Sequence, residues 1–150
     1  RAVGMNILSG ERRGHPERPE RLSFRHLVQS ADVLSLHCPL TETTRNMIDR
    51  EVLRAMKPGA FLINTARGGL VNESDLADAL RAGDIAGAGI DVFSEEPPPL
   101  DHPLLADDIP NLVLTPHNAW GSVLARQEAI DQVTAAIRSF ERGVPLNRVV

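Results

Sequence analysis

The chain has 150 residues, of which 42% are hydrophobic and 24% charged, and its formal net charge is −4. This length is enough for one domain with a hydrophobic core, and the negative charge argues against a nucleic-acid-binding surface. No apolar run approaches the ~18 residues that a membrane span needs, so no membrane partner is expected. Cys38 is the only cysteine, which excludes an internal disulfide and fits a reducing, cytoplasmic setting.

Short apolar runs separated by turn residues predict five strands. We expect them in "GMNILS" (4–9), "DVLSLHCPL" (32–40, closed by Pro39), "AFLIN" (60–64), "GAGIDVF" (87–93) and "NLVLTPH" (111–117). The unbroken run at 60–64 is typical of a strand buried in a parallel sheet.

Helical spacing and end signals predict four helices between or after these strands. We expect them over about 24–30, 50–56, 72–82 and 121–142, with Ser23, Asp49 and Asn72 as N-caps and Gly83 as a C-cap. The last helix places Ile130, Val133, Ile137 and Phe140 on one face. Strands that alternate with helices indicate an α/β fold with crossover connections and a parallel sheet.

Polar residues stand at the carboxyl end of every predicted strand, where open α/β sheets bind their ligands. They are Glu11, then His37-Cys38-Pro39, Thr65-Ala66-Arg67, Asp91 with Glu96, and Thr115-Pro116-His117. An arginine suits the two-pronged binding of a carboxylate, and a histidine can transfer a proton near neutral pH. The set fits a substrate that has a carboxylate next to a carbonyl or hydroxyl group.

Each of these residues also has a plain structural interpretation. Arg67 could form a salt bridge, Glu96 could be a solvated charge before three prolines, and His117 could be a hydrogen-bonded residue at a strand end. His37-Cys38 has no second ligand pair at metal-site spacing, so no metal is expected. The presence of Arg67, Glu96 and His117 at neighbouring strand ends favours a functional site.

Four long segments resemble the D-isomer-specific 2-hydroxyacid dehydrogenase family. They are "ADVLSLHCPLTETTRNMI", "LINTARGGLVNESDLADAL", "AGAGIDVFSEEPPP" and "NLVLTPHNAW". The resemblance implies a three-layer, Rossmann-like, doubly wound parallel sheet and hydride transfer between a nicotinamide cofactor and a 2-hydroxy or 2-keto acid. "HNAW" and "ILSGERR" look most like the glycerate dehydrogenase (hydroxypyruvate reductase) branch, in which Trp120 would shape the substrate pocket.

The resemblance also implies roles for single residues. Arg67 would bind the substrate carboxylate and carbonyl, His117 would be the general acid/base, and Glu96 would pair with His117. Asp91 would hydrogen-bond the nicotinamide carboxamide. Thr65, Ala66 and the stretch from His117 to Ala119 would line the nicotinamide side of the cofactor, which Arg67 would also contact. Cys38 and Pro39 would flank its adenosine half, and Thr44 would approach the cofactor as well. A homodimer is implied as well.

Glu11 stands where the family holds an acidic residue against the adenosine ribose. An acidic side chain there accepts a hydrogen bond from the 2′-hydroxyl and repels a 2′-phosphate, which favours NAD. Arg12 and Arg13 follow directly and could accept a phosphate instead, so NADP remains an alternative.

The glycine-rich phosphate loop G-x-G-x-x-G is absent from the sequence. We therefore expect residues 1–150 to be a partial NAD-binding domain with its C-terminal helix. The first strand, its loop and the substrate-binding domain would lie upstream in a longer protein. Two other functions stay open: a cofactor-sensing interaction protein, as in corepressor relatives of the family, and an inactive fragment of the dehydrogenase.

Overall fold

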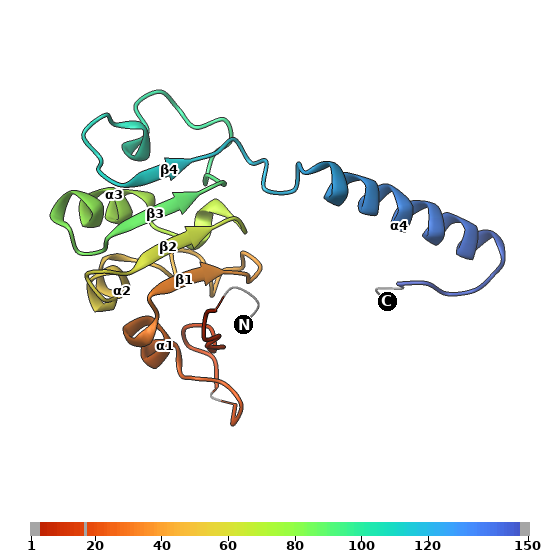
Figure 1. Ribbon diagram of the computed structural model, residues 1–150, viewed down its shortest axis with the longest axis horizontal. Helices are drawn as coiled ribbons and strands as arrows, with labels where there is room; N and C mark the ends of the chain where they lie inside the picture. Colours follow the sequence, from red (N-terminus) through yellow and green to blue (C-terminus); the bar gives the residue numbers. More distant parts are fainter. Residues whose placement is uncertain (1–3, 17, 148–150) are drawn as a thin grey trace. The chain divides into compact units, whose positions relative to one another are not determined.

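The computed structural model describes residues 4–16 and 18–147, which form two compact units, Arg1–Pro116 and His117–Val150 (Figure 1). The first unit contains a four-stranded sheet and three α-helices, and the second contains one long helix.

The sheet is parallel throughout and its strands are adjacent in chain order, β1-β2-β3-β4. The strands are β1 (Val33–Leu36), β2 (Phe61–Asn64), β3 (Gly87–Ile90) and β4 (Leu112–Leu114). Leu36 pairs with Asn64 and Asn64 pairs with Ile90, so the strands end level with one another. This register places the residues that follow each strand along a single edge of the sheet. The predicted α/β class and parallel sheet are confirmed.

These three helices begin and end within one residue of their predicted bounds. They are α1 (Phe24–Ser30), α2 (Arg50–Ala55) and α3 (Glu73–Ala82). The N-cap side chains of Ser23, Asp49 and Asn72 each accept a backbone N–H from the first turn, which satisfies one of its unpaired donors. Gly83 ends α3 in the left-handed conformation, at φ 72°, which costs a glycine little.

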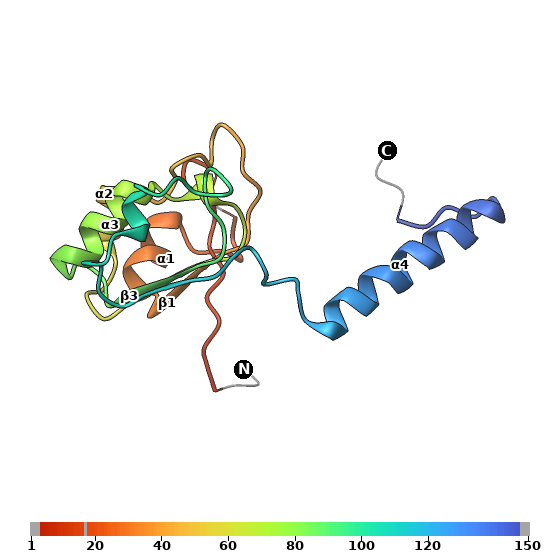
Figure 2. The same ribbon diagram turned by 90° about the horizontal axis from the view of Figure 1, so that it is seen from above.

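Helices α1, α2 and α3 lie on one face of the sheet (Figure 2). That face is the core, where Leu34, Leu62 and Ala88 are buried side by side across three strands. On the opposite face Val33 is 48% exposed, Phe61 46% and Val113 64%. The described residues of this unit therefore form two of the three expected layers, and the prediction that the strand at 60–64 is buried is wrong for Phe61.

The prediction of a strand at residues 4–9 is wrong. A strand needs a hydrogen-bonding partner along its length. Residues 4–9 form no strand pairing in the described part of the chain, and the nearest bridge is the isolated one between Gly10 and Leu22. The amide of Leu22 donates to Ser9 O, and the amide of Glu11 donates to Leu22 O, each at 2.9 Å. These two bonds close a loop over residues 11–22.

Two short 3₁₀ helices complete the first unit, η1 (Gly68–Leu70) and η2 (Pro103–Leu105), the latter between β3 and β4. The second unit is α4 (Val123–Glu141), whose N-cap Ser122 accepts the amide of Ala125. Its predicted apolar face is exposed, from 56% at Ile137 to 86% at Phe140. None of the helices in the described residues has the length and apolar character to cross a membrane.

Candidate functional site

A hollow of about 640 Å³ lies at the carboxyl ends of β1 and β2. Its lining comes from the two segments that directly follow these strands: His37, Cys38, Pro39, Leu40, Thr65, Ala66 and Arg67. Five of the predicted site residues, at positions 38, 39, 65, 66 and 67, are therefore brought together. The volume is in the usual range for small-molecule sites.

The shape of the β2 end depends on Asn64, which is not among the predicted site residues. Its side chain is 1% exposed. The Oδ1 atom accepts the amide of Ala66 at 3.1 Å, and Nδ2 donates to the carbonyl of Arg67 at 2.9 Å. An Asn side chain that bonds the backbone two residues further on is a known turn former. The signal for this turn in the sequence is therefore Asn64 itself, a polar residue at the end of an apolar run.

Arg67 is exposed at the rim of the hollow. Its Nη1 donates to the carbonyl of Ala66 at 2.6 Å, which uses one of the five N–H donors of the guanidinium. The neighbouring Gly68 is buried because the chain after β3 runs directly against it. A Cβ on Gly68 would lie 1.9 Å from the carbonyl carbon of Phe93. This glycine is needed for a close approach between two backbones.

Asp91 follows β3 at the same edge of the sheet and is 3% exposed. Its amide donates to Asn64 O at 2.9 Å, which extends the β2–β3 pairing by one residue. The hydroxyl of Thr115, after β4, donates to Asp91 Oδ1 at 2.5 Å. A carboxylate is therefore fixed beside the turn that carries Arg67, as the strand-end pattern predicted.

Glu96 lies in the exposed loop after β3, where its Oε1 accepts the amide of Phe93 at 2.9 Å. A buried pair anchors this loop to α3. Glu73 Oε1 accepts the amide of Ser94 at 2.8 Å, and Glu73 Oε2 lies 3.2 Å from His102 Nε2. His102 Nδ1 accepts the amide of Leu104, so Nε2 carries the proton that faces Glu73. This pair is not among the predicted site residues, and the one signal near it in the sequence is Pro103, which indicates a helix start after His102.

Thr44 and Cys38 differ in their access to the hollow. Thr44 is fully buried, and its hydroxyl donates to the carbonyl of Pro39 at 2.8 Å. This placement gives Thr44 an indirect role in shaping the hollow and does not support a direct contact with a cofactor. Cys38 lines the hollow itself. Burial raises the pKa of its thiol, and the positive charge of Arg12 opposes part of that rise.

Glu11 lies next to the loop closure at Gly10 and Leu22 and is only 5% exposed. Arg18 donates from Nε and Nη2 to its two carboxylate oxygens, at 2.5 and 2.9 Å. These hydrogen bonds, with the charges of Arg18, Arg21 and His15, lower the pKa of Glu11 against the effect of burial. Glu11 is therefore an ionised carboxylate, held in place by arginine.

His117 and Ala119 belong to the second unit. His117 has a φ of 51°, and its carbonyl accepts Nε1–H of Trp120 at 2.8 Å. The amide of Gly121 donates to Asn118 O and completes this tight turn before α4. Because Arg67 and Glu96 lie in the first unit, the predicted meeting of these two residues with His117 stays a prediction.

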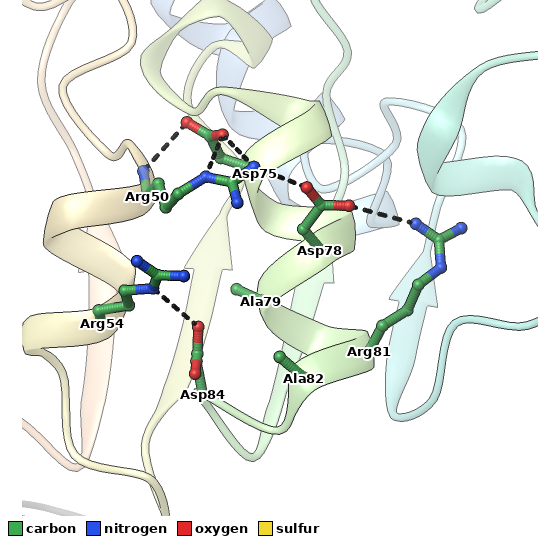
Figure 3. Close-up of a pocket in the computed structure, with 8 residues that line it drawn as sticks. All are labelled: Arg50, Arg54, Asp75, Asp78, Ala79, Arg81, Ala82 and Asp84. Carbon is green, nitrogen blue, oxygen red and sulfur yellow. Dashed lines mark hydrogen bonds and ion pairs between the residues drawn. The ribbon is translucent and has the colours of Figure 1, made fainter.

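A second hollow, of about 390 Å³, lies between α2 and α3 and carries only charged and alanine side chains (Figure 3). Arg50 bonds Asp75 and Asp78, Arg54 pairs with Asp84, and Arg81 pairs with Asp78. Every charged side chain that lines it is paired with an opposite charge. We interpret this groove as the surface at which the two helices are joined.

Comparison with known proteins identifies the family of the chain. A family model, "D-isomer specific 2-hydroxyacid dehydrogenase, NAD binding domain", matches residues 1–119. The chain is 49% identical over 123 residues to a glycerate dehydrogenase of Methylorubrum extorquens, covering 82% of this chain and 39% of that protein. It is 36% identical over 152 aligned positions to a hydroxypyruvate reductase of Blautia hydrogenotrophica, covering 99% and 47%.

Solved structures give the same result for the fold. The crystal structure of a glyoxylate reductase from Paecilomyes thermophila matches with a TM-score of 0.80 and 34% identity, over 99% of this chain and 46% of that one. The chain thus spans less than half the length of these relatives. By the extent of the family match and by these identities, the chain belongs to the D-isomer-specific 2-hydroxyacid dehydrogenase family, and its residues 1–119 match the model of that family's NAD-binding domain.

Proposed function

We propose that this chain is the part of a dehydrogenase that holds the nicotinamide cofactor and supplies the groups for proton transfer. The reaction moves a hydride between NAD(H) and a D-2-hydroxy acid or its 2-keto acid, most closely the glycerate/hydroxypyruvate pair. The observation that carries the proposal is the hollow at the carboxyl ends of β1 and β2, with Arg67 at its rim and Asp91 on the next strand. The named relatives support the choice of substrate.

The residues present fit one part of such a cofactor. The hollow combines the apolar surfaces of Pro39, Leu40 and Ala66 with the polar side chain of Thr65, as suits an aromatic ring that carries polar groups. The sequence offers no glycine-rich loop for a pyrophosphate. Bound nicotinamide would supply the hydride, and the steps that belong to this chain concern the substrate and the proton.

Arg67 would hold the substrate carboxylate through two parallel N–H donors and would stabilise the negative charge that develops on the carbonyl oxygen. As the hydride reaches the substrate C2, His117 would give its proton to that oxygen, and it would take the proton back in the reverse direction. Glu96 would orient the imidazole and favour its protonated form. A homodimer in a cytoplasmic setting belongs to the same proposal.

The test is the reduction of hydroxypyruvate, glyoxylate and pyruvate by the intact polypeptide that carries this sequence, with NADH and with NADPH. Arg67→Ala should raise the KM for the keto acid and lower kcat, and His117→Ala should lower kcat by about 10²–10⁴-fold, the usual contribution of a proton-transfer residue. Arg25→Ala and His26→Ala are the matched controls, because both side chains are exposed on α1. Activity that survives both site substitutions within a few-fold would contradict the assigned roles.

A further inference from the structure

One carboxylate, that of Glu73, holds both ends of residues 94–102, here called the Glu96 loop. Its Oε1 accepts the amide of Ser94 at 2.8 Å, and its Oε2 lies 3.2 Å from Nε2 of His102. Glu73 is the first residue of α3, where a negative charge stabilises a helix even when it is exposed to solvent. The side chain is nevertheless only 12% exposed. A role at the helix end alone does not explain this burial.

The two contacts of Glu73 require a group that accepts hydrogen bonds on both of its oxygens. His102 Nδ1 accepts the amide of Leu104 at 3.2 Å, so the neutral ring carries its proton on Nε2 and donates it to Glu73. The amide of Ser94 is a donor as well. An ionised carboxylate accepts from both, whereas a side-chain amide has one acceptor oxygen and would face the second donor with its own N–H groups.

Arg67 lies on the same stretch of chain as Glu73, separated from it by η1 and the cap of α3. Within that stretch Gly68 lies against the loop that follows β3, because a Cβ on Gly68 would be 1.9 Å from the carbonyl carbon of Phe93. The side chain of Glu96 accepts the amide of the same Phe93. The stretch that carries Arg67 and the loop that carries Glu96 are therefore joined at two points, the backbone contact at Gly68 and the carboxylate of Glu73.

We propose that Glu73 is a positioning residue for the reaction. By closing the Glu96 loop against the stretch that carries Arg67, it sets where Glu96 lies relative to the arginine that binds the substrate. Glu73 acts through Glu96 and does not itself meet the substrate or the cofactor, and His102 completes the closure as the donor at the far end of the loop. The proposal rests on the proposed function, in which Glu96 favours the protonated imidazole of His117.

The test is the pH dependence of kcat/KM for hydroxypyruvate, measured at saturating NADH on the intact polypeptide with Glu73→Gln. This variant keeps the size of the side chain and can accept only one of the two hydrogen bonds, so one end of the loop is released. Glu96 then favours the protonated imidazole less, and His117 loses its proton at a lower pH. Because reduction consumes that proton, the alkaline limb should move down by about one pH unit, which lowers kcat/KM about tenfold on that limb.

A second variant releases the other end of the loop. His102→Asn keeps an acceptor for the amide of Leu104, and asparagine is a good N-cap, but its side chain is too short to reach Glu73. It should move the limb in the same direction as Glu73→Gln. The KM for NADH should be unchanged in both variants, because neither Glu73 nor His102 lines the hollow at the ends of β1 and β2.

Asp101→Asn is the matched control and should leave the profile in place. It also converts a carboxylate of the Glu96 loop into an amide, at an exposed side chain that makes no ion pair with any described residue. The double variant Glu73→Gln/Glu96→Gln should titrate like Glu96→Gln alone, because the effect of Glu73 passes through Glu96. Deuterium uptake over 94–102 should rise in Glu73→Gln, while uptake over β2 stays at the wild-type level.

A limb that moves in Glu96→Gln but in neither Glu73→Gln nor His102→Asn would overturn the proposal and leave the proposed function standing. Equal shifts in Glu73→Gln and Asp101→Asn, or additive shifts in the double variant, would also overturn it, because the effect would not pass through Glu96. An unmoved limb in Glu96→Gln itself would contradict the role that the proposed function gives to Glu96, and the role of Glu73 would fail with it.

Discussion

The side-chain amide of Asn64 donates to the backbone carbonyl of Arg67 at 2.9 Å, and the same side chain accepts the amide of Ala66. One buried residue thereby fixes both ends of the turn that presents the guanidinium. The backbone position of Arg67 is therefore determined by the end of β2.

Asn64→Ala should weaken substrate binding more than cofactor binding. It removes two hydrogen bonds at a cost of about 1–3 kcal/mol in stability, because two backbone groups lose their partner. We expect a larger rise in the KM for the keto acid than in the KM for the cofactor, together with a lower melting temperature. Asn64→Asp keeps the acceptor for Ala66 and loses the donor to Arg67, so its KM for the keto acid should lie between those of the wild type and Asn64→Ala. Equal kinetics for all three proteins would rule out a positioning role.

Gly68 should be far less tolerant of substitution than other glycines of the chain. Gly68→Ala would place a methyl group 1.9 Å from the Phe93 backbone, which cannot move aside as a flexible side chain could. We expect a loss of about 3 kcal/mol or more in the free energy of unfolding, measured by denaturant titration. Gly59→Ala is the control, because no atom lies within 4 Å of the added methyl. A Gly68→Ala protein as stable as the control would show that the two backbones do not meet here.

The Glu73–His102 pair should control the order of the loop that carries Glu96. His102→Ala removes the partner of the Glu73 side chain, which is only 12% exposed. It also opens space beside Phe93, whose ring packs edge-on against the His102 ring with 5.2 Å between the ring centroids. We expect faster amide hydrogen exchange at Ser94 and a loss of about 1–3 kcal/mol in stability. His26→Ala, on the exposed side of α1, should change neither quantity; unchanged exchange at Ser94 in His102→Ala would contradict the anchoring role.

Acid should open the loop over residues 11–22 through the protonation of Glu11. Its pKa in the folded chain is lowered, chiefly by the hydrogen bonds from Arg18. Its stabilising effect is therefore complete above the ordinary glutamate pKa of about 4.3 and is lost as the pH falls through the lower folded value. The amide resonance of Leu22, which reports the bond to Ser9 O, should shift in that acidic range. Glu11→Gln should remove this dependence, and a Leu22 shift that persists in the variant would assign the transition to another carboxylate.

The sequence predicts the helices well because each has a local end signal. Ser23, Asp49 and Asn72 cap the helices that their positions indicate, and Gly83 ends α3. The strand predicted at residues 4–9 fails for the opposite reason, since apolar character is local but strand formation depends on a partner. The predicted burial of Phe61 is wrong for the same reason, because burial on the second face of a sheet requires a covering layer, which the local sequence of the strand cannot specify.

The candidate site is predictable as far as strand ends determine it. The strand-end rule brings residues 38, 39, 65, 66 and 67 to one hollow. It cannot reveal that Arg18 folds back on Glu11 across a loop, or that Glu73 meets His102 over 29 positions of sequence. Both pairs consist of charged or polar residues without periodicity, so only the folded chain shows them.

The outward face of the sheet has a consequence for handling the chain by itself. Phe61 lies between its partners Val33 on β1 and Gly87 on β3, and Val33, Phe61 and Val113 all leave much of their surface to water on this face. Exposed apolar surface of this kind promotes aggregation and binds fluorescent dyes such as anilinonaphthalene sulfonate. Threonine at positions 33 and 113 would keep the β-branched shape while adding a hydroxyl, and so offers a route to a chain that stays dispersed at the concentrations that spectroscopy requires.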